Sequence, residues 1–143
     1  MRVADILRRK GTETATVRQG DSVARAVEVL REKGFGALVV SSDGRKIEGI
    51  VSERDVVRAL GLRPDLLDLP VSEIMTAKVF TCTPEHKIDQ LMAMMTEHRF
   101  RHVPVEVDGE LQGLVSIGDV VKHRVNELEN ETQAMQEYIH HGR

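Results

Sequence analysis

Apolar residues recur along the chain at two kinds of spacing, one typical of helices and the other typical of strands. In two segments, four apolar residues lie at i, i+3, i+4 and i+7, which places them on one face of a helix. They are Val23, Ala26, Val27 and Leu30 in the first segment, and Ile88, Leu91, Met92 and Met95 in the second. Each segment follows a stretch that we predict to be a short strand, Ala15–Arg18 or Val79–Thr83. Gly34 favours an end to the first helix.

After each predicted helix comes a pair of β-branched runs separated by Asp-Gly, at 37–51 and at 103–115. This pattern is a strong signal of a β-hairpin. A second helix is predicted after each hairpin, over Asp55–Leu60 and from Asp119 onward. The predicted order of elements is therefore β-α-β-β-α, and it occurs twice.

The two halves of the chain repeat one another, which is the sequence signature of a duplicated structural unit. GIVSERDVV at 49–57 returns as GLVSIGDVV at 113–121, and only the middle pair of letters differs in character. Further upstream, VADIL at 3–7 is echoed by VSEIM at 71–75. We therefore expect a first unit at 3–60, a linker with two prolines at 61–70, a second unit at 71–127 and a C-terminal helical extension at 128–143.

One such unit would leave an apolar face of its sheet uncovered, and units below about 60 residues are marginally stable alone. We therefore predict an α+β fold in which two pseudo-twofold-related units pack sheet to sheet. The methionine-rich stretch LMAMM at 91–95 is interpreted as core rather than as a metal or haem site, because Met fills irregular gaps in apolar cores.

Charge and cysteine content exclude several function classes. The formal net charge is −3, with 20 Lys and Arg against 23 Asp and Glu, so we expect no nucleic-acid partner. The basic run Arg8-Arg9-Lys10 is interpreted as a solvated helix end. Cys82 is the sole cysteine, which excludes an intrachain disulfide and a CxxC site.

No apolar run reaches the roughly 18 residues of a membrane span. The N-terminus also lacks a long apolar h-region, so we expect a cytoplasmic protein without a membrane partner.

Ser52-x-x-Asp55 and Ser116-x-x-Asp119 each follow an apolar strand and open a helix. As a structural pattern, each is a capping box. The same position presents free backbone N–H groups and the positive end of the helix dipole, which favour an anion such as phosphate. The Ser hydroxyl can donate to a phosphate, and the Asp carboxylate can accept hydrogen bonds from both hydroxyls of a ribose. The two interpretations are compatible, and the second describes a nucleotide site.

With these motifs, the chain resembles a tandem pair of cystathionine-β-synthase-type (CBS) domains that form one stand-alone Bateman module. The matching stretches within 3–127 are VADIL and VSEIM, TVRQGDSVARAV and TCTPEHKIDQLM, RFRHVPV, and GIVSERDVV and GLVSIGDVV. The resemblance implies a cleft between the two units with two pseudo-symmetric sites. Such sites commonly bind adenosine compounds, namely AMP, ADP, ATP, NAD(H), S-adenosylmethionine or dinucleotide messengers.

The resemblance also implies two sets of site residues. One site would use Asp119 on the ribose and Ser116 near the phosphate, with the base near Val17, Arg18, Val23 and the backbone of Phe35, Gly36 and Ala37. The other site would use Asp55 and Ser52, with the base near Thr83, Ile88 and the backbone of Phe100, Arg101 and His102. Gln19 stands where the second unit has Pro84, so the base-binding edge of the Asp119 site is expected to be shaped differently.

The middle pair of the repeated motif predicts that the two sites differ in phosphate preference. Arg54 can add a bidentate phosphate contact, whereas Gly118, its counterpart, leaves room but adds no charge. The Asp55 site is therefore expected to tolerate more phosphate charge, unless Arg54 points to solvent.

These observations favour a regulatory sensor that binds an adenosine ligand and signals its occupancy to an effector protein. His98 and His102 are four residues apart, a spacing that could hold a metal on one helix. We expect no metal site, because the helix that carries His98 should end near Arg99 and His102 should enter a strand. We expect no enzyme and no catalytic cofactor, because the sequence has no GxSxG, HExxH or P-loop motif. An interaction scaffold with degenerate clefts and a slow nucleotide-processing enzyme are the alternatives.

The last helix is expected to run on toward Ile139 and to carry an apolar stripe. Val121, Val125, Leu128, Thr132, Met135 and Ile139 are spaced 4, 3, 4, 3 and 4 apart. This alternation is typical of a seam between two helices. We expect a homodimer in which CBS pairs meet through their helices and this extension adds a contact. The alternative is that the extension folds back on its own domain.

Overall fold

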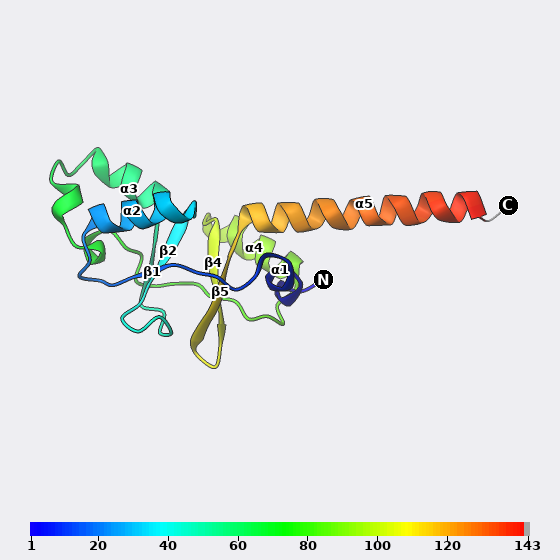
Figure 1. The fold of residues 1–143 in the computed structure, drawn as a ribbon, viewed down its shortest axis with the longest axis horizontal. Coiled ribbons are helices and arrows are strands. Elements are labelled where there is room, and N and C mark those ends of the chain that lie inside the picture. Colours follow the sequence, from blue (N-terminus) through cyan, green and yellow to red (C-terminus); the bar gives the residue numbers. More distant parts are fainter. Residues whose placement is uncertain (142–143) are drawn as a thin grey trace.

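The structure, a computed structural model, describes residues 1–141. Gly142 and Arg143, the last two positions of the expected extension, lie outside the described residues. In chain order (Figure 1), the elements are α1 (Val3–Lys10), β1 (Thr16–Val17), α2 (Val23–Lys33), β2 (Ala37–Val40), β3 (Gly49–Ser52), α3 (Glu53–Leu60), the short 3-10 helices η1 (Leu66–Asp68) and η2 (Val71–Glu73), α4 (Ile88–His98), β4 (His102–Val107), β5 (Glu110–Ser116) and α5 (Ile117–His141).

Local sequence signals account for both ends of α2. The Ser22 hydroxyl accepts a hydrogen bond from the Arg25 N–H and caps the start of α2, and Gly34 ends the helix in the left-handed conformation at φ 68°. This confirms the expected stop at Gly34, where a residue without Cβ takes positive φ at no steric cost. Helix α4 ends at Arg99, also left-handed at φ 58°, and His102 opens β4 as expected.

Strands β1, β2 and β3 form one sheet, and β4 and β5 form the other. The expected strand Val79–Thr83 was wrong, because only Cys82 pairs there, in an isolated parallel bridge with Val105. The neighbouring backbone groups have other partners. The Thr83 N–H donates to Nδ1 of His86 at 2.9 Å, and the Pro84 carbonyl accepts from the Ala4 N–H at 2.9 Å. The first strand is also shorter than expected, since β1 is only Thr16–Val17.

The two Asp-Gly turns differ. Asp108 and Gly109 form a tight turn between β4 and β5 with φ of 54° and 78°, which confirms the second hairpin. In the first unit, β2 and β3 pair in antiparallel register, but a loop at 41–48 separates them. There the Asp43 carboxylate accepts hydrogen bonds from the backbone N–H groups of Arg45 and Lys46, both at 2.8 Å. The side chain thus supports a wider loop than the expected tight turn.

The leading segment of each unit packs on the other unit. Helix α1 is held by the second unit, where the Val3 N–H donates to the His86 carbonyl at 2.9 Å and the Ile88 N–H donates to the Met1 carbonyl at 3.1 Å. In return, the Val71 N–H donates to the Asp21 carbonyl at 2.7 Å. The segment 61–70, expected as a linker, is also part of the fold, because Leu66 is fully buried.

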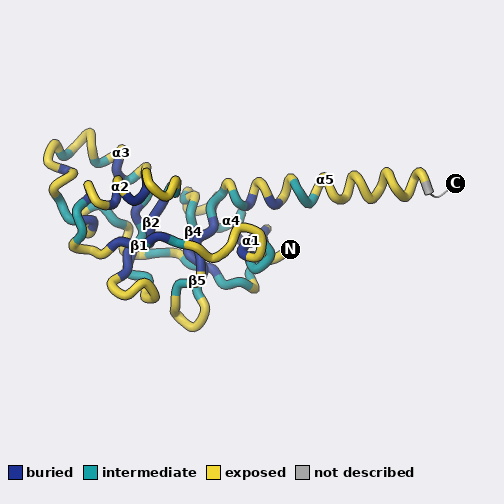
Figure 2. The backbone as a smooth tube through the Cα atoms, viewed as in Figure 1, coloured by how far each residue is buried: buried dark blue, intermediate teal, exposed yellow. Residues whose placement is uncertain are grey.

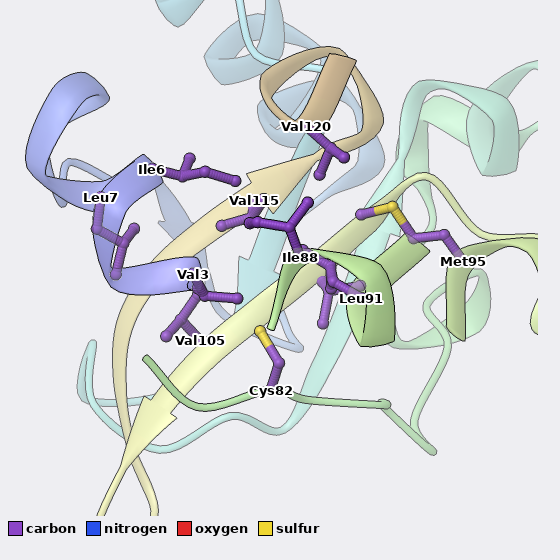
Figure 3. Close-up of a cluster of buried hydrophobic side chains, with 11 residues drawn as sticks. Val3, Ile6, Leu7, Cys82, Ile88, Leu91, Met95, Val105, Val115 and Val120 are labelled. Atoms are coloured by element: carbon purple, nitrogen blue, oxygen red, sulfur yellow. The ribbon is translucent and has the colours of Figure 1, made fainter. Parts of the chain in front are cut away.

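In the part of the chain that the structure describes, four apolar clusters form the core. The largest joins α1, α4, β4, β5 and the start of α5 (Figure 3) and includes Met95, with Met92 and Met94 packed against it. This confirms that the methionine-rich stretch is core. A separate cluster places Ala37 and Val39 of the first sheet against Leu114 of the second. The two sheets therefore pack against each other, and the predicted α+β fold with two paired units is confirmed.

Helix α5 continues well past the second unit and projects from it as a single rod (Figure 1). Among the α5 side chains whose burial the structure describes, 117–140, the buried ones are Val120 and His123 in the first two turns. Most side chains beyond them are exposed (Figure 2). Val125, Leu128 and Ile139 are 45%, 54% and 57% exposed. The alternative in which the extension folds back on its own domain is therefore wrong.

Candidate functional site

Both Ser-x-x-Asp motifs form the predicted capping boxes. At the start of α3, the Ser52 N–H donates to Oδ2 of Asp55 at 2.8 Å, and the Asp55 N–H donates to the Ser52 hydroxyl at 3.2 Å. At the start of α5, the Ser116 N–H donates to Oδ2 of Asp119 at 2.9 Å, and the Asp119 N–H donates to the Ser116 hydroxyl at 3.1 Å. The cap thus uses Oδ2 of each Asp, and within the described residues no hydrogen bond reaches the other carboxylate oxygen.

The two carboxylates differ in their surroundings. In the described residues, Asp55 accepts hydrogen bonds only from the backbone and hydroxyl of Ser52. Asp119 also accepts a hydrogen bond from Nζ of Lys10 at 2.7 Å, and the same ammonium donates to the Leu114 carbonyl at 2.6 Å. Burial acts to raise the pKa of Asp119, but the Lys10 ammonium and the Ser116 N–H hold it below its ordinary value. Asp119 is therefore ionised at neutral pH.

Asp119 faces a cavity of about 300 Å³ that both units line. From the first unit come Lys10, Glu13, Thr14, Gly34, Phe35 and Gly36, and from the second unit come His102, Leu114, Ser116 and Asp119. The cavity therefore joins the start of α5 to the turn that follows α2. This is the pairing that the resemblance implied for Ser116, Asp119 and the Phe35-Gly36 backbone.

Several residues expected at the base of the Asp119 site do not line this cavity. Val17, Val23 and Ala37 are almost completely buried in the apolar clusters. Arg18 is exposed, and its N–H donates to the Asp21 carboxylate at 2.8 Å. Their assignment to a ligand stays a prediction.

The residues expected around the Asp55 site are more dispersed. Ile88 is 2% exposed and belongs to the core of the second unit, while Thr83 is bonded to His86 through both its N–H and its hydroxyl. Phe100 stacks on Phe80 and His98, with ring centroids 5.5 and 5.7 Å away. The backbone of Arg101 is used inside the fold, where its carbonyl accepts a hydrogen bond from the Ile117 N–H at 2.8 Å.

The side chain of His102 lies at the Asp119 cavity rather than at the Asp55 site to which its backbone was assigned. It packs against Gly36 so closely that a Cβ added there would lie 2.9 Å from Nε2. Burial lowers the pKa of His102, and the carboxylates of Asp119 and Glu53 oppose this without overcoming it. The ammonium of Lys10 adds to the lowering. Because its pKa lies below the ordinary value, the imidazole is mostly neutral at pH 7 in the folded protein.

This shift predicts a loss of stability in mild acid. The unfolded chain binds a proton at His102 below a pKa of about 6.5, whereas the folded protein resists doing so. The free energy of unfolding should therefore fall as pH drops through that value. Urea denaturation at pH 7.5 and 5.5 measures the change, and His102→Gln should reduce it. The matched control is His140→Gln, at an exposed position near the end of α5. An equal pH dependence in His102→Gln and the parent chain contradicts the prediction.

Sequence reasoning missed Lys10, Glu13, Thr14 and the His102 side chain. The interpretation of Lys10 as part of a solvated helix end was wrong. Its ammonium donates hydrogen bonds to the Asp119 carboxylate and the Leu114 carbonyl. One signal was available. If VADIL and VSEIM are aligned, Lys10 falls opposite Lys78, so the duplicated unit carries a lysine at this place twice.

The described part of the chain gives little support for a cysteine nucleophile, a metal site or a membrane-spanning helix. Burial, with the Glu106 carboxylate adding to it, raises the pKa of the Cys82 thiol to about 12, so this cysteine is not a nucleophile at neutral pH. Among residues 1–141, no three His, Cys, Asp or Glu side chains gather as a metal site would require. Within the same residues, no helix is both long and apolar enough to cross a membrane.

Comparison with known proteins identifies the family. The sequence model of the CBS domain matches twice, over residues 3–62 and 71–126. The CBS domain-containing protein CBSX3, mitochondrial, from Arabidopsis thaliana is 36% identical over 98% of this chain and 72% of its own length. The structure of the CBS-domain containing protein ATU1752 from Agrobacterium tumefaciens superposes with a TM-score of 0.83, with 44% identity, over 87% of this chain and 99% of that one.

A more distant CBS domain pair, that of protein MJ0100, shares the fold with a TM-score of 0.79 at 23% identity, over 89% of this chain and 98% of that one. It was solved in complex with 5′-methylthioadenosine and S-adenosyl-L-methionine. Three findings agree on the family. Two matches of the family model together span most of the sequence, the two units carry matching capping boxes, and solved CBS structures share the fold. The chain belongs to the CBS domain family and is a tandem CBS pair.

Proposed function

We propose that this CBS pair is a regulatory module that binds an adenosine-containing ligand between its units and signals occupancy to an effector protein. The observation that carries the proposal is the cavity that joins the start of α5 to the Phe35-Gly36 turn of the other unit. A ligand there contacts both units at once, so its binding energy can favour one relative arrangement of them.

The chemistry of the site matches a nucleotide. Helix α5 is 25 residues long, and its first N–H groups, with the Ser116 hydroxyl, favour a phosphate. The ionised Asp119 beside them suits the two hydroxyls of a ribose. The complex of the MJ0100 pair with two adenosine compounds supports an adenosine ligand as a class. AMP, ADP, ATP, NAD(H) and S-adenosylmethionine all belong to it.

A homodimer is part of the proposal, because apolar side chains are exposed on equivalent helices of the two units. Val57, Leu60 and Leu62 are 68%, 53% and 84% exposed on and just after α3. Val121, which matches Val57 in the repeat, is 52% exposed on α5. Exposed apolar side chains that gather into one patch mark protein–protein contacts, and these residues are candidates for such a patch. We infer that CBS pairs meet through these helices, and that the dimer passes the signal on to the effector.

Ligand binding is tested by thermal melts with millimolar AMP, ATP, NADH and S-adenosylmethionine. A ligand at 100 times its dissociation constant should add about 2.7 kcal/mol, which for a chain of this size is a shift of roughly 5–10 °C. Asp55→Asn combined with Asp119→Asn should abolish the shift while keeping a capping oxygen. The matched control is Asp89→Asn, in the first turn of α4, where the carboxylate is 77% exposed.

Each other outcome selects a different function. If none of the four compounds shifts the melting temperature, the sensor is rejected in favour of an interaction scaffold. If the double variant binds as well as the Asp89→Asn control, the binding site lies elsewhere. If the pure protein converts a nucleotide to product, and the double variant does not, the enzyme alternative replaces the regulatory one.

A further inference from the structure

Lys10 is placed where it must respond to any ligand at Asp119. Its ammonium donates to Oδ2 of Asp119 and to the Leu114 carbonyl, at 2.7 and 2.6 Å. The side chains of Lys10 and Asp119 are 32% and 24% exposed. Ile6 and Leu7 anchor α1 in the core of the second unit, so the Cα of Lys10 is fixed and only its flexible side chain can move.

The ammonium competes with a ribose for the carboxylate. Oδ2 of Asp119 already accepts the Ser116 N–H and the Lys10 ammonium, which leaves little capacity on that oxygen. A diol that uses both carboxylate oxygens has to displace Lys10. An uncharged nucleoside offers the displaced ammonium no anionic partner, and a cation that loses its partner in a partly buried site is costly.

A phosphate ester changes this balance. A ligand with its ribose on Asp119 places its phosphate at the start of α5, beside the Ser116 hydroxyl. In this first turn the residues are Ile117 and Gly118, which bring no positive charge. Nearby Glu13 is acidic and lies 3.6 Å from Nζ of Lys33 in an ion pair. Among the described residues that line the cavity, Lys10 is therefore the Lys or Arg that can exchange the carboxylate for the phosphate, and charge-assisted hydrogen bonds to phosphate are strong.

We propose that Lys10 is a specificity-determining residue that makes the Asp119 site select nucleotides with a 5′-phosphate over the nucleosides without one. This rests on the proposed function. In the ligand-free protein the ammonium holds Asp119, and in the complex it binds the phosphate. The α1 segment thus brings to the Asp119 site a positive charge that Gly118 does not provide. The absence of charge at Gly118 is then no longer a reason to expect less tolerance of phosphate charge at this site than at the Asp55 site.

The repeat provides an internal control. Lys78 occupies the position equivalent to Lys10 and is exposed, while in the described residues Asp55 accepts hydrogen bonds only from Ser52. Substitution of Lys78 removes the same charge from the equivalent place without removing a contact to a ribose-binding carboxylate.

The test is calorimetry with adenosine and AMP on the full chain carrying Asp55→Asn, which leaves the Asp119 site as the one under study. Lys10→Met should weaken AMP binding and strengthen adenosine binding. The preference for AMP over adenosine should fall by roughly 10- to 100-fold, the range expected for a charged hydrogen bond. Lys10→Arg should retain most of the preference, and Lys78→Met should leave it unchanged. The salt dependence of AMP binding should also decrease in Lys10→Met.

The outcomes separate this inference from the proposed function. If the parent chain binds no adenosine compound, the proposed function fails. If it binds them but the Asp55→Asn chain does not, or if Lys10→Met leaves the preference unchanged, the role of Lys10 is rejected. Equal weakening of adenosine and AMP also rejects it, because that result shows Lys10 supports the fold of the site rather than its choice of ligand.

Discussion

Replacing Ile6 with alanine should lower the free energy of unfolding by about 2–5 kcal/mol, the range for truncating a buried aliphatic side chain. Ile6 lies in α1, at the start of the first unit in the chain, yet it is only 3% exposed and belongs to the core of the second unit. There it lies close to Val115 of β5 (Figure 3). The loss would be a large part of the stability of a domain of this size.

Urea denaturation of the full chain measures this loss. The matched control is Arg9→Ala, which truncates an exposed side chain of the same helix and should change stability by no more than about 0.5 kcal/mol. If Ile6→Ala costs as little as the control, α1 does not dock in the way the structure shows.

A double-mutant cycle identifies which unit holds α1. Ile6→Val and Val115→Ala change side chains in one cluster, so their effects should be coupled by at least about 0.5 kcal/mol. Ile6→Val and Val40→Ala affect different clusters, so their effects should add. If Ile6→Val is instead coupled to Val40→Ala and additive with Val115→Ala, α1 packs on the first unit. That result would contradict the packing of each unit's leading segment on the other unit.

The sequence predicted those features whose cause is local. Helix α2 begins at the Ser22 cap and ends at Gly34, and both signals lie within the helix and its first neighbours. The tight turn at Asp108 and Gly109 is local in the same sense. The docking of α1 is not, because the carbonyl groups that hold it belong to His86 and Pro84, far along the chain. Apolar spacing shows which face of α1 is buried but not what buries it.

The candidate site divides in the same way. The Ser52 and Ser116 caps were predictable, because the motif fixes which N–H and hydroxyl groups meet within four residues. Lys10 was not, because in sequence it is only the last of three basic residues. Its role depends on the docking of α1, which brings its ammonium to Asp119. A repeat alignment that paired Lys10 with Lys78 would have marked the position without giving its partner.

Shortening the chain to end at Glu127 should weaken the proposed homodimer, because it removes most of the apolar stripe on α5. Of the stripe residues beyond that point, Leu128, Met135 and Ile139 are 54%, 67% and 57% exposed. Their spacing with Thr132 is that of a helical seam. Helix α5 projects from the body (Figure 2), so its own domain does not cover the stripe.

The charges beside the seam fit a second copy of the same helix. Lys122 and Arg124 flank the first part of the stripe, and Glu129 and Glu131 flank the second. Two copies can therefore place basic residues of one helix against acidic residues of the other, as at the edges of coiled coils. Pairs of this kind favour the correct partner more than they add to affinity.

A single substitution tests the seam without removing any of the chain. Leu128→Glu places a charge in the stripe of both partners, and burial of one Leu is worth roughly 1.5–3 kcal/mol. With two such positions in a dimer, the dissociation constant should rise by at least about 100-fold. Asn130→Glu introduces the same residue on the outer face of α5 and is the matched control.

Light scattering over a concentration series measures the dissociation of both variants, together with that of the chain that ends at Glu127. A parent chain that is monomeric throughout would disprove the dimer. If the parent is a dimer, and neither Leu128→Glu nor the shortened chain dissociates more readily than Asn130→Glu, the contact lies on the CBS units alone and α5 has no part in it.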